Sequence, residues 1–180
     1  MVHLDFPDKI FTPRLYLEPL KYEDAEEIFY TYASKPEATR FVSWPTHKTI
    51  SDTNSFILYA RTARQQHKDY SFAIRTLREN RLVGSIGVMN FDGEIQFGYI
   101  ISPTQWNKGY ATEVCKAILK YVKSQSGVKR VFTYVAPENI ASIRVLNKCG
   151  LIEEARLSRH MIFPNVSPEP GDCFLFFLPL

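Results

Sequence analysis

The segment QWNKGYATEV, residues 105–114, has residue types that could bind a phosphate group, and it lies between a predicted strand and a predicted helix. The first backbone N–H groups of a helix have no partner within the helix and lie at the positive end of its dipole. Gly109 allows the backbone to approach a ligand or to adopt a positive φ, and Ala111 keeps the next turn uncrowded. The segment indicates either an anion site or only a tight strand–helix turn. The candidate donors are the amides of Asn107, Lys108, Gly109, Tyr110, Ala111 and Thr112.

Two better-known phosphate-binding patterns do not fit this segment. The P-loop requires a second glycine followed by Lys-Ser or Lys-Thr, and the dinucleotide fingerprint requires three glycines. Gly84 and Gly87 do not open a helix, so we assign them to a strand or a bulge.

Asn139 and Ser142 form a second candidate group near the start of a later helix. Residues three apart share one face of a helix, so the two side chains can act on the same neighbour. Asn139 is also a favourable N-cap, in which case its role would be structural.

Cysteine and histidine usage excludes some chemistry. The chain has Cys115, Cys149 and Cys173, four scattered histidines and no CxxC pair, so we expect neither a disulfide framework nor a metal site. Cys149 could suggest a covalent acyl-enzyme, but no histidine is near it in sequence, and a buried thiol is the favoured interpretation.

Composition bounds the class of protein. A chain of 180 residues with 45% hydrophobic residues is expected to form one domain over residues 1–180. The net charge of +3 comes without runs of like charge, so nothing indicates direct nucleic-acid binding. Because no apolar run reaches membrane-spanning length, we expect no membrane association and a cytoplasmic protein.

The elements that must position these residues follow from hydrophobic periodicity and turn residues. A strand–helix–strand unit over residues 94–136 predicts that its two strands are parallel, unless another strand lies between them. Pro36 is expected to end the first helix, and Ser51 or Asp52 to cap the second. The apolar tail, residues 174–180, could be a central strand or a dimer edge. Strands are predicted at residues 12–20, 70–77, 81–91, 94–102, 129–136 and in the tail, and helices at 22–33, 51–66, 111–122 and 138–150.

The stretch WNKGYATE resembles the acetyl-CoA pyrophosphate loop of the GNAT acetyltransferases, and is most similar to their RimJ/RimL branch. TPRLYLEPL, FGYIISP and ENIASIRVLNKCGL extend the resemblance through nearly the whole chain. It implies an α/β (α+β) fold with a mixed, mostly antiparallel sheet of about six or seven strands, a splayed parallel pair and about four flanking helices.

The resemblance also implies acetyl-CoA as cosubstrate, no metal, and roles for particular residues. The splayed strands would be residues 97–102 and 131–136, with backbone contacts to the cosubstrate from Ile100, Ile101 and Ser102 and thioester polarisation by N–H groups near Ile100. Asn139 would contact the pantetheine or amine region, and Ser142 would lie near the sulfur.

Three positions depart from the family pattern. Trp106 replaces the usual Arg or Gln of the loop, which favours the RimJ/RimL branch, and we expect it to pack. Leu146 stands where many members have a tyrosine acid, which leaves Ser142 as the candidate proton donor. Gln96 stands where related sequences often have a glutamate base. Glu94, acting through water, is the favoured replacement, with Glu154, Asp172, Tyr99 or water alone as alternatives.

The resemblance favours a protein N-terminal α-amine as acceptor, a ribosomal protein being one candidate. The alternatives are a small-molecule amine (antibiotic, polyamine or amino acid) and a non-catalytic acyl-CoA sensor. Phe41, Trp44 and Tyr99 are the candidate acceptor-pocket residues. Peptides need an open groove and small amines a closed pocket, so the loops at residues 41–49 and 160–171 should distinguish them. The chain could be a monomer or a homodimer.

Overall fold

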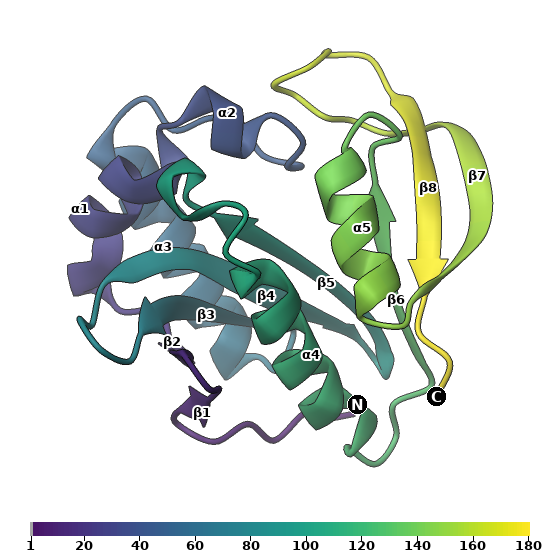
Figure 1. Cartoon of the computed structure of the whole chain (residues 1–180), viewed down its shortest axis with the longest axis horizontal. Helices are drawn as coiled ribbons and strands as arrows, with labels where there is room; N and C mark the ends of the chain where they lie inside the picture. The colour runs from purple at the N-terminus through teal and green to yellow at the C-terminus, as the bar shows by residue number, and fades with distance from the viewer. Residues whose placement is uncertain (1) are drawn as a thin grey trace.

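The computed structural model describes residues 2–180, and its centre is one 8-stranded sheet in the order β1-β2-β3-β4-β5-β6-β8-β7 (Figure 1). Neighbouring strands are antiparallel except β5 and β6, so the mixed, mostly antiparallel sheet with one parallel pair is confirmed. The sheet has one or two strands more than expected because two-residue β1 extends its edge. The strands are β1 Ile10–Phe11, β2 Leu15–Pro19, β3 Asp69–Thr76, β4 Leu82–Phe91, β5 Glu94–Ile101, β6 Arg130–Val135, β7 Ile152–Met161 and β8 Gly171–Phe177.

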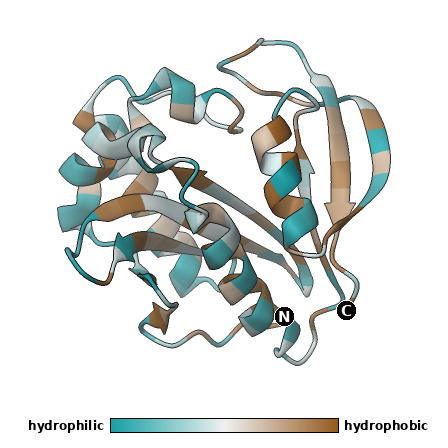
Figure 2. Cartoon of the chain, in the orientation of Figure 1, coloured by the Kyte–Doolittle hydropathy of each residue, from teal (hydrophilic) through white to brown (hydrophobic). Residues whose placement is uncertain are grey.

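Helices cover the sheet on two sides. Alternate residues of a strand point to opposite faces, and the two core clusters follow this alternation. Phe97 belongs to the cluster that includes residues of α4 and α5, whereas Ile100 belongs to the cluster of α1 and α3. Figure 2 shows hydrophobic colouring on the central strands and on one side of α4 and α5, with hydrophilic colouring on outer turns. The helices are α1 Ala25–Ile28, α2 Pro36–Thr39, α3 Ile50–Gln65, α4 Tyr110–Lys123 and α5 Ile140–Lys148.

β5 and β6 pair only at their beginnings and then diverge. Their parallel register is Glu94↔Arg130, Ile95↔Val131 and Gln96↔Phe132. Beyond it, the buried Thr133 hydroxyl donates to the Phe97 carbonyl at 2.7 Å. The diverging segments, residues 97–101 of β5 and 133–135 of β6, are called the splay below; Figure 1 shows them separating toward the end where α5 begins.

Local details differ from the sequence-based expectations at three places. Pro36 begins α2 rather than only ending the preceding helix, because proline suits the first turn, where its missing N–H is not needed. α3 is capped by Thr49, whose side chain accepts from the Asp52 N–H, and not by Ser51 or Asp52. The tail forms β8, which lies between β6 and β7 and is therefore an interior strand.

Candidate active site

The predicted anion-binding segment lies at the N-terminus of α4, directly after β5. Gly109 is the N-cap and has φ 78°, a left-handed conformation that favours glycine. Asn107 also has a positive φ, 61°, which asparagine tolerates better than most residues. The turn directs the first amides of the 14-residue helix α4 outward, as an anion site requires.

An arginine near the N-terminus, which the sequence analysis did not single out, holds this segment in place. Arg14 donates through its Nη1 to the Lys108 carbonyl at 2.8 Å and through Nε to Glu113 at 2.7 Å. The Thr12 hydroxyl also donates to Glu113, at 2.6 Å. Burial alone would raise the pKa of Glu113, but the hydrogen bonds from Thr12 and Arg14 outweigh it and lower the pKa. Residues about 100 positions apart meet here, which periodicity cannot predict.

The β4–β5 register shows which amides of β5 face the splay. The Ser102 N–H donates to the Val83 carbonyl of β4, and a Cβ at Gly84 would overlap the Ile100 carbonyl oxygen. Backbone groups alternate in direction along a strand, so Ile100 and Ser102 face β4, whereas Tyr99 and Ile101 face the splay. The amides near Ile100 that face the splay are therefore those of Tyr99 and Ile101, and their role as donors stays a prediction.

Trp106 contributes a hydrogen bond in addition to packing. Its indole N–H donates to the Ile101 carbonyl at 2.8 Å, while 44% of the residue remains exposed. This bond joins the beginning of the predicted anion-binding segment to the end of β5. The expected packing role of Trp106 was thus incomplete.

A pair of hydroxyl groups connects β5 to the first turn of α5. The Tyr99 hydroxyl lies 3.0 Å from Ser142 Oγ, and either group can donate. Burial raises the pKa of Tyr99 above its ordinary value, so this phenol holds its proton. Asn139 caps α5 by accepting from the Ser142 N–H at 3.2 Å, which agrees with the structural alternative for this residue. The arrangement can deliver a proton or a hydrogen bond from Ser142.

The carboxylates considered as general bases lie elsewhere. Glu94 begins β5 opposite Arg130, five residues before Tyr99 and on the other face of the strand. At about 3.3 Å per residue this separates it from Ser142 by far more than hydrogen-bond reach. Glu154 is paired with the same Arg130. Asp172 accepts from the Arg159 N–H and from Arg156, and these bonds lower its pKa. None of the three is placed beside the Tyr99–Ser142 pair.

The predicted acceptor-pocket residues fall in three different places. Phe41 packs against the cluster of Ala136, Phe163 and Cys173 near the end of β6. Trp44 stacks on Phe56 of α3, with ring centroids 6.3 Å apart, and Tyr99 points toward α5. The role of these three side chains in an acceptor pocket stays a prediction.

Gly98 marks an access point that the sequence reasoning missed. It lies in an interior strand yet is exposed, and a Cβ built on it would have nothing within 4 Å. Because Gly98 is two residues from Ile100, it faces the side of the sheet that α1 and α3 cover. The β5 backbone at the splay is therefore open from the side opposite α4 and α5.

Other candidate features have structural explanations. Cys149 Sγ lies 3.8 Å from the Thr112 carbonyl and packs on the core beside α4. Within residues 2–180 no group of three or more His, Cys, Asp or Glu side chains could hold a metal ion. In the same range, no helix is long and apolar enough to cross a membrane.

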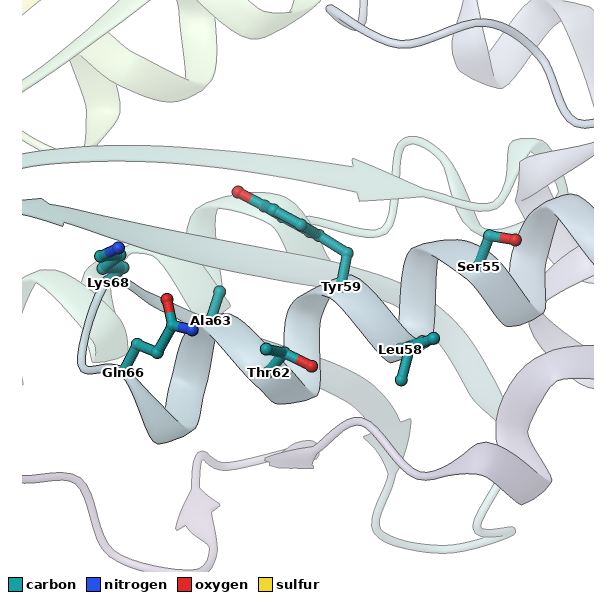
Figure 3. A pocket seen from close by; sticks show the side chains of 7 residues that line it. All are labelled: Ser55, Leu58, Tyr59, Thr62, Ala63, Gln66 and Lys68. Atoms are coloured by element: carbon teal, nitrogen blue, oxygen red, sulfur yellow. The ribbon is translucent and has the colours of Figure 1, made fainter.

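A surface hollow of about 410 Å³ lies along α3 (Figure 3). Its lining comes from that helix and from Gln66 and Lys68 just beyond it, and includes the exposed Leu58 and Tyr59. It shares no residue with the splay or with the N-terminus of α4, so it is separate from the candidate active site.

Together these features define a transferase that could hold an anionic, thioester-bearing donor between two strands. A family model described as the acetyltransferase (GNAT) domain matches residues 14–152, and the chain belongs to this family. An uncharacterised N-acetyltransferase of Bacillus subtilis (strain 168), YoaA, is 30% identical over 171 residues, which cover 93% of this chain and 96% of the relative. The protein is an N-acetyltransferase of the GNAT type.

Solved structures share the fold over nearly the whole chain. An acetyltransferase (GNAT family) from Bacillus anthracis superposes with a TM-score of 0.82 at 26% identity, covering 94% of this chain and 97% of that one. RimJ of Mycobacterium smegmatis, in complex with CoA-disulfide, has a TM-score of 0.85 at 19% identity, with 98% and 89% covered. The curated relatives do not distinguish the RimJ/RimL branch from others.

Proposed function

We propose that this enzyme transfers the acetyl group of acetyl-CoA directly to the N-terminal α-amine of a protein or peptide. The exposed Gly98 beside the splay is the observation that carries the acceptor part of the proposal. It leaves the β5 backbone accessible from the α1/α3 face, whereas the N-terminus of α4 and the Tyr99–Ser142 pair lie on the opposite side. Access from two sides suits a reaction in which donor and acceptor are bound together.

The residues present fit acetyl-CoA. The amides that follow Gly109 suit the pyrophosphate, and the unpaired edge of β5 suits an extended arm carrying amide groups. When bound, acetyl-CoA supplies an activated acyl group as a thioester. The N–H groups of Tyr99 and Ile101 face the splay, where they can donate to a carbonyl oxygen on which negative charge develops.

Proton transfers are assigned to the chain's own groups and to water. Ser142 Oγ donates a hydrogen bond to the departing sulfur, which leaves as a thiolate, and the protonated Tyr99 hydroxyl donates in turn to Ser142 Oγ, so neither hydroxyl gives up its proton. No carboxylate among Glu94, Glu154 and Asp172 is placed to accept the amine proton, so we assign this step to water. An α-amine with a pKa of about 8 is partly neutral without a base.

Side-chain chemistry near the end of β6 favours a peptide over a polyamine. Phe41, Tyr134 and Phe163 gather there, and the nearby carboxylate of Asp172 is already held by Arg156 and the Arg159 N–H. A polycation would need several free carboxylates to replace its hydration. Aromatic side chains suit the uncharged backbone and side chains that follow an α-amine.

The test measures CoA release with peptides that have free or blocked N-termini, and with spermidine, an aminoglycoside and free amino acids. We expect turnover with free-N-terminus peptides and none with blocked ones. Turnover confined to small amines would overturn the assigned acceptor, and acetyl-CoA binding without turnover of any amine would favour a sensor.

The variant Gly98→Val tests whether the acceptor approaches β5 beside Gly98. The side chain enters open space, so the strand should tolerate it, while the approach to β5 becomes obstructed. We expect kcat/KM for the peptide to fall by about tenfold or more, with little change in KM for acetyl-CoA. The control is Asn54→Ala, at an exposed position on α3. Equal activity of both variants would exclude the Gly98 approach.

A further inference from the structure

Asn165 connects two loops that come from opposite sides of the splay. Its Oδ1 accepts from the Thr46 N–H at 2.8 Å and from the Thr46 hydroxyl at 3.0 Å. Its Nδ2 donates to the carbonyls of Thr39 at 2.7 Å and of Trp44 at 2.9 Å. One side-chain amide thus makes four hydrogen bonds between the β7–β8 loop and the α2–α3 loop. We call these contacts the Asn165 clasp.

Both loops are themselves rigid. In the β7–β8 loop, Pro164, Pro168 and Pro170 fix backbone φ angles, and the N–H groups of Val166 and Ser167 both donate to the Phe163 carbonyl. In the α2–α3 loop, the hydroxyls of Thr39 and Thr46 lie 2.6 Å apart, and the His47 N–H donates to the Ala33 carbonyl. The clasp therefore joins two loops that each have hydrogen bonds of their own.

The clasp lies at the wide end of the splay. Phe163, two residues before Asn165, packs with Ala136, which directly follows β6. The Ala136 carbonyl accepts from the N–H of Asn139, the cap of α5. α2 contacts β5 on the other side. Figure 1 shows the α2–α3 loop and the β7–β8 loop facing each other beyond the beginning of α5.

The splay is thus bounded at both ends. The Thr133–Phe97 hydrogen bond closes its narrow end, and the clasp spans its wide end. Trp44 of the joined loops packs on the cluster that contains Ile100, which is the side of β5 that the exposed Gly98 faces. Phe41 and Tyr134 pack against Ala136, Phe163 and Cys173 near the end of β6.

We propose that Asn165 determines acceptor specificity by holding the two loops together and admitting only slender amines. The accepted class is an extended chain end whose first side chain is small, while bulky or branched groups next to the amine are rejected. The peptide nature of the acceptor rests on the proposed function above, but the width limit does not. Asn165 is a positioning residue, since it acts through the loops.

The experiment compares two peptides that differ only in their first residue, glycine or phenylalanine, on the wild type, Asn165→Ala and Asn165→Asp. The ratio of kcat/KM for the phenylalanine peptide to that for the glycine peptide is the readout. We expect Asn165→Ala to raise this ratio by about tenfold, a typical discrimination for pocket size, with KM for acetyl-CoA unchanged. Asn165→Asp keeps the acceptor oxygen but replaces the donor with a carboxylate oxygen that repels the Thr39 and Trp44 carbonyls, so its ratio should rise at least as much as that of Asn165→Ala. Asn54→Ala, an exposed position on α3, is the matched control.

Three results decide the matter. A raised ratio in Asn165→Ala, with the control unchanged, supports the proposal. An unchanged ratio together with a lower melting temperature means that the clasp only stabilises the fold, and overturns it. If the wild type acetylates small amines but no peptide, the proposed acceptor fails. The same ratio measured with n-butylamine and tert-butylamine then tests the width limit independently. Should Asn165→Ala not fold, Asn165→Asp and Thr46→Val provide the comparison.

Discussion

At the scale of single residues, the Tyr99–Ser142 hydrogen bond leads to a kinetic prediction. Ser142→Ala removes the group that donates to the departing sulfur, and we expect kcat to fall about 10- to 100-fold. This loss lies at or below the lower end of the range for a positioned general acid, because a hydroxyl group is a weak acid. KM for acetyl-CoA should change little. Steady-state kinetics with saturating acetyl-CoA provide the measurement. A variant with full kcat would remove Ser142 from the mechanism.

Tyr99→Phe is the control for that prediction, because it keeps the ring and removes only the partner hydroxyl. Its kcat should fall less than that of Ser142→Ala. The double variant should be no slower than Ser142→Ala, since both changes interrupt one path and their effects do not add. Additive losses would mean that the two hydroxyls act independently.

The pH dependence of kcat/KM for the amine is a second residue-scale prediction. Burial raises the pKa of Tyr99, so its protonated form persists as pH rises, and no carboxylate is placed as base. The rate should therefore increase with pH as the acceptor α-amine loses its proton, with an apparent pKa of about 8, and then stay level. A rate profile from pH 6 to 9.5 measures this. A falling limb below pH 9.5 would reveal an acid that titrates earlier than Tyr99.

At the scale of elements, Thr133 determines where β5 and β6 separate. Thr133→Val keeps the shape of the side chain but leaves the buried Phe97 carbonyl without its donor, which costs about 1–3 kcal/mol. For a chain of this size each kcal/mol lowers the melting temperature by about 2–4 °C. We also expect a higher KM for acetyl-CoA, because the narrow end of the splay loosens. Thr133→Ser retains the hydroxyl and should restore most of both properties.

The sequence predicted elements better than their long-range contacts. The strand–helix–strand unit over residues 94–136 was recognised because period-two and period-3.6 patterns are local, and its strands are parallel neighbours as expected. The Arg14–Glu113 and Asn165–Thr46 contacts join residues about 100 positions apart and have no periodicity. The amide direction at Ile100 required the β4–β5 register, which one strand alone does not contain.

The candidate site residues also divide into those that local sequence patterns predict and those whose positions depend on long-range contacts. Gly109 could be identified because a strand–helix turn with a positive φ favours glycine at that position. The sequence also brought Asn139 and Ser142 together, since they share one helical turn. The sequence did not predict that Glu94 is far from Ser142. The predicted strand alone does not show at which residue β5 separates from β6.

At the scale of the whole molecule, the sheet divides into two parts at the splay. The connections of β6, β8, β7 and α5 to the rest include three β5–β6 residue pairs, the Thr133 bond, the Tyr99–Ser142 pair, the Asn165 clasp and packing of α5 on α4. By contrast, β3 and β4 pair over seven positions. Regions with fewer cross-connections open at a lower free energy than the global unfolding.

Hydrogen exchange should therefore be faster for the amides of β6 and β8 than for those of β3 and β4. Acetyl-CoA that contacts both β5 and α4 on one side and α5 on the other must be released when the parts separate. At about 100 times its dissociation constant it should slow β6 and β8 exchange by about 100-fold, equivalent to about 2.7 kcal/mol. Equal rates in all four strands without acetyl-CoA would show a single cooperative unit. If acetyl-CoA slowed hydrogen exchange in β3 and β4 but not in β6 and β8, the C-terminal part would be opening while acetyl-CoA stays bound. Acetyl-CoA would then not bridge the splay.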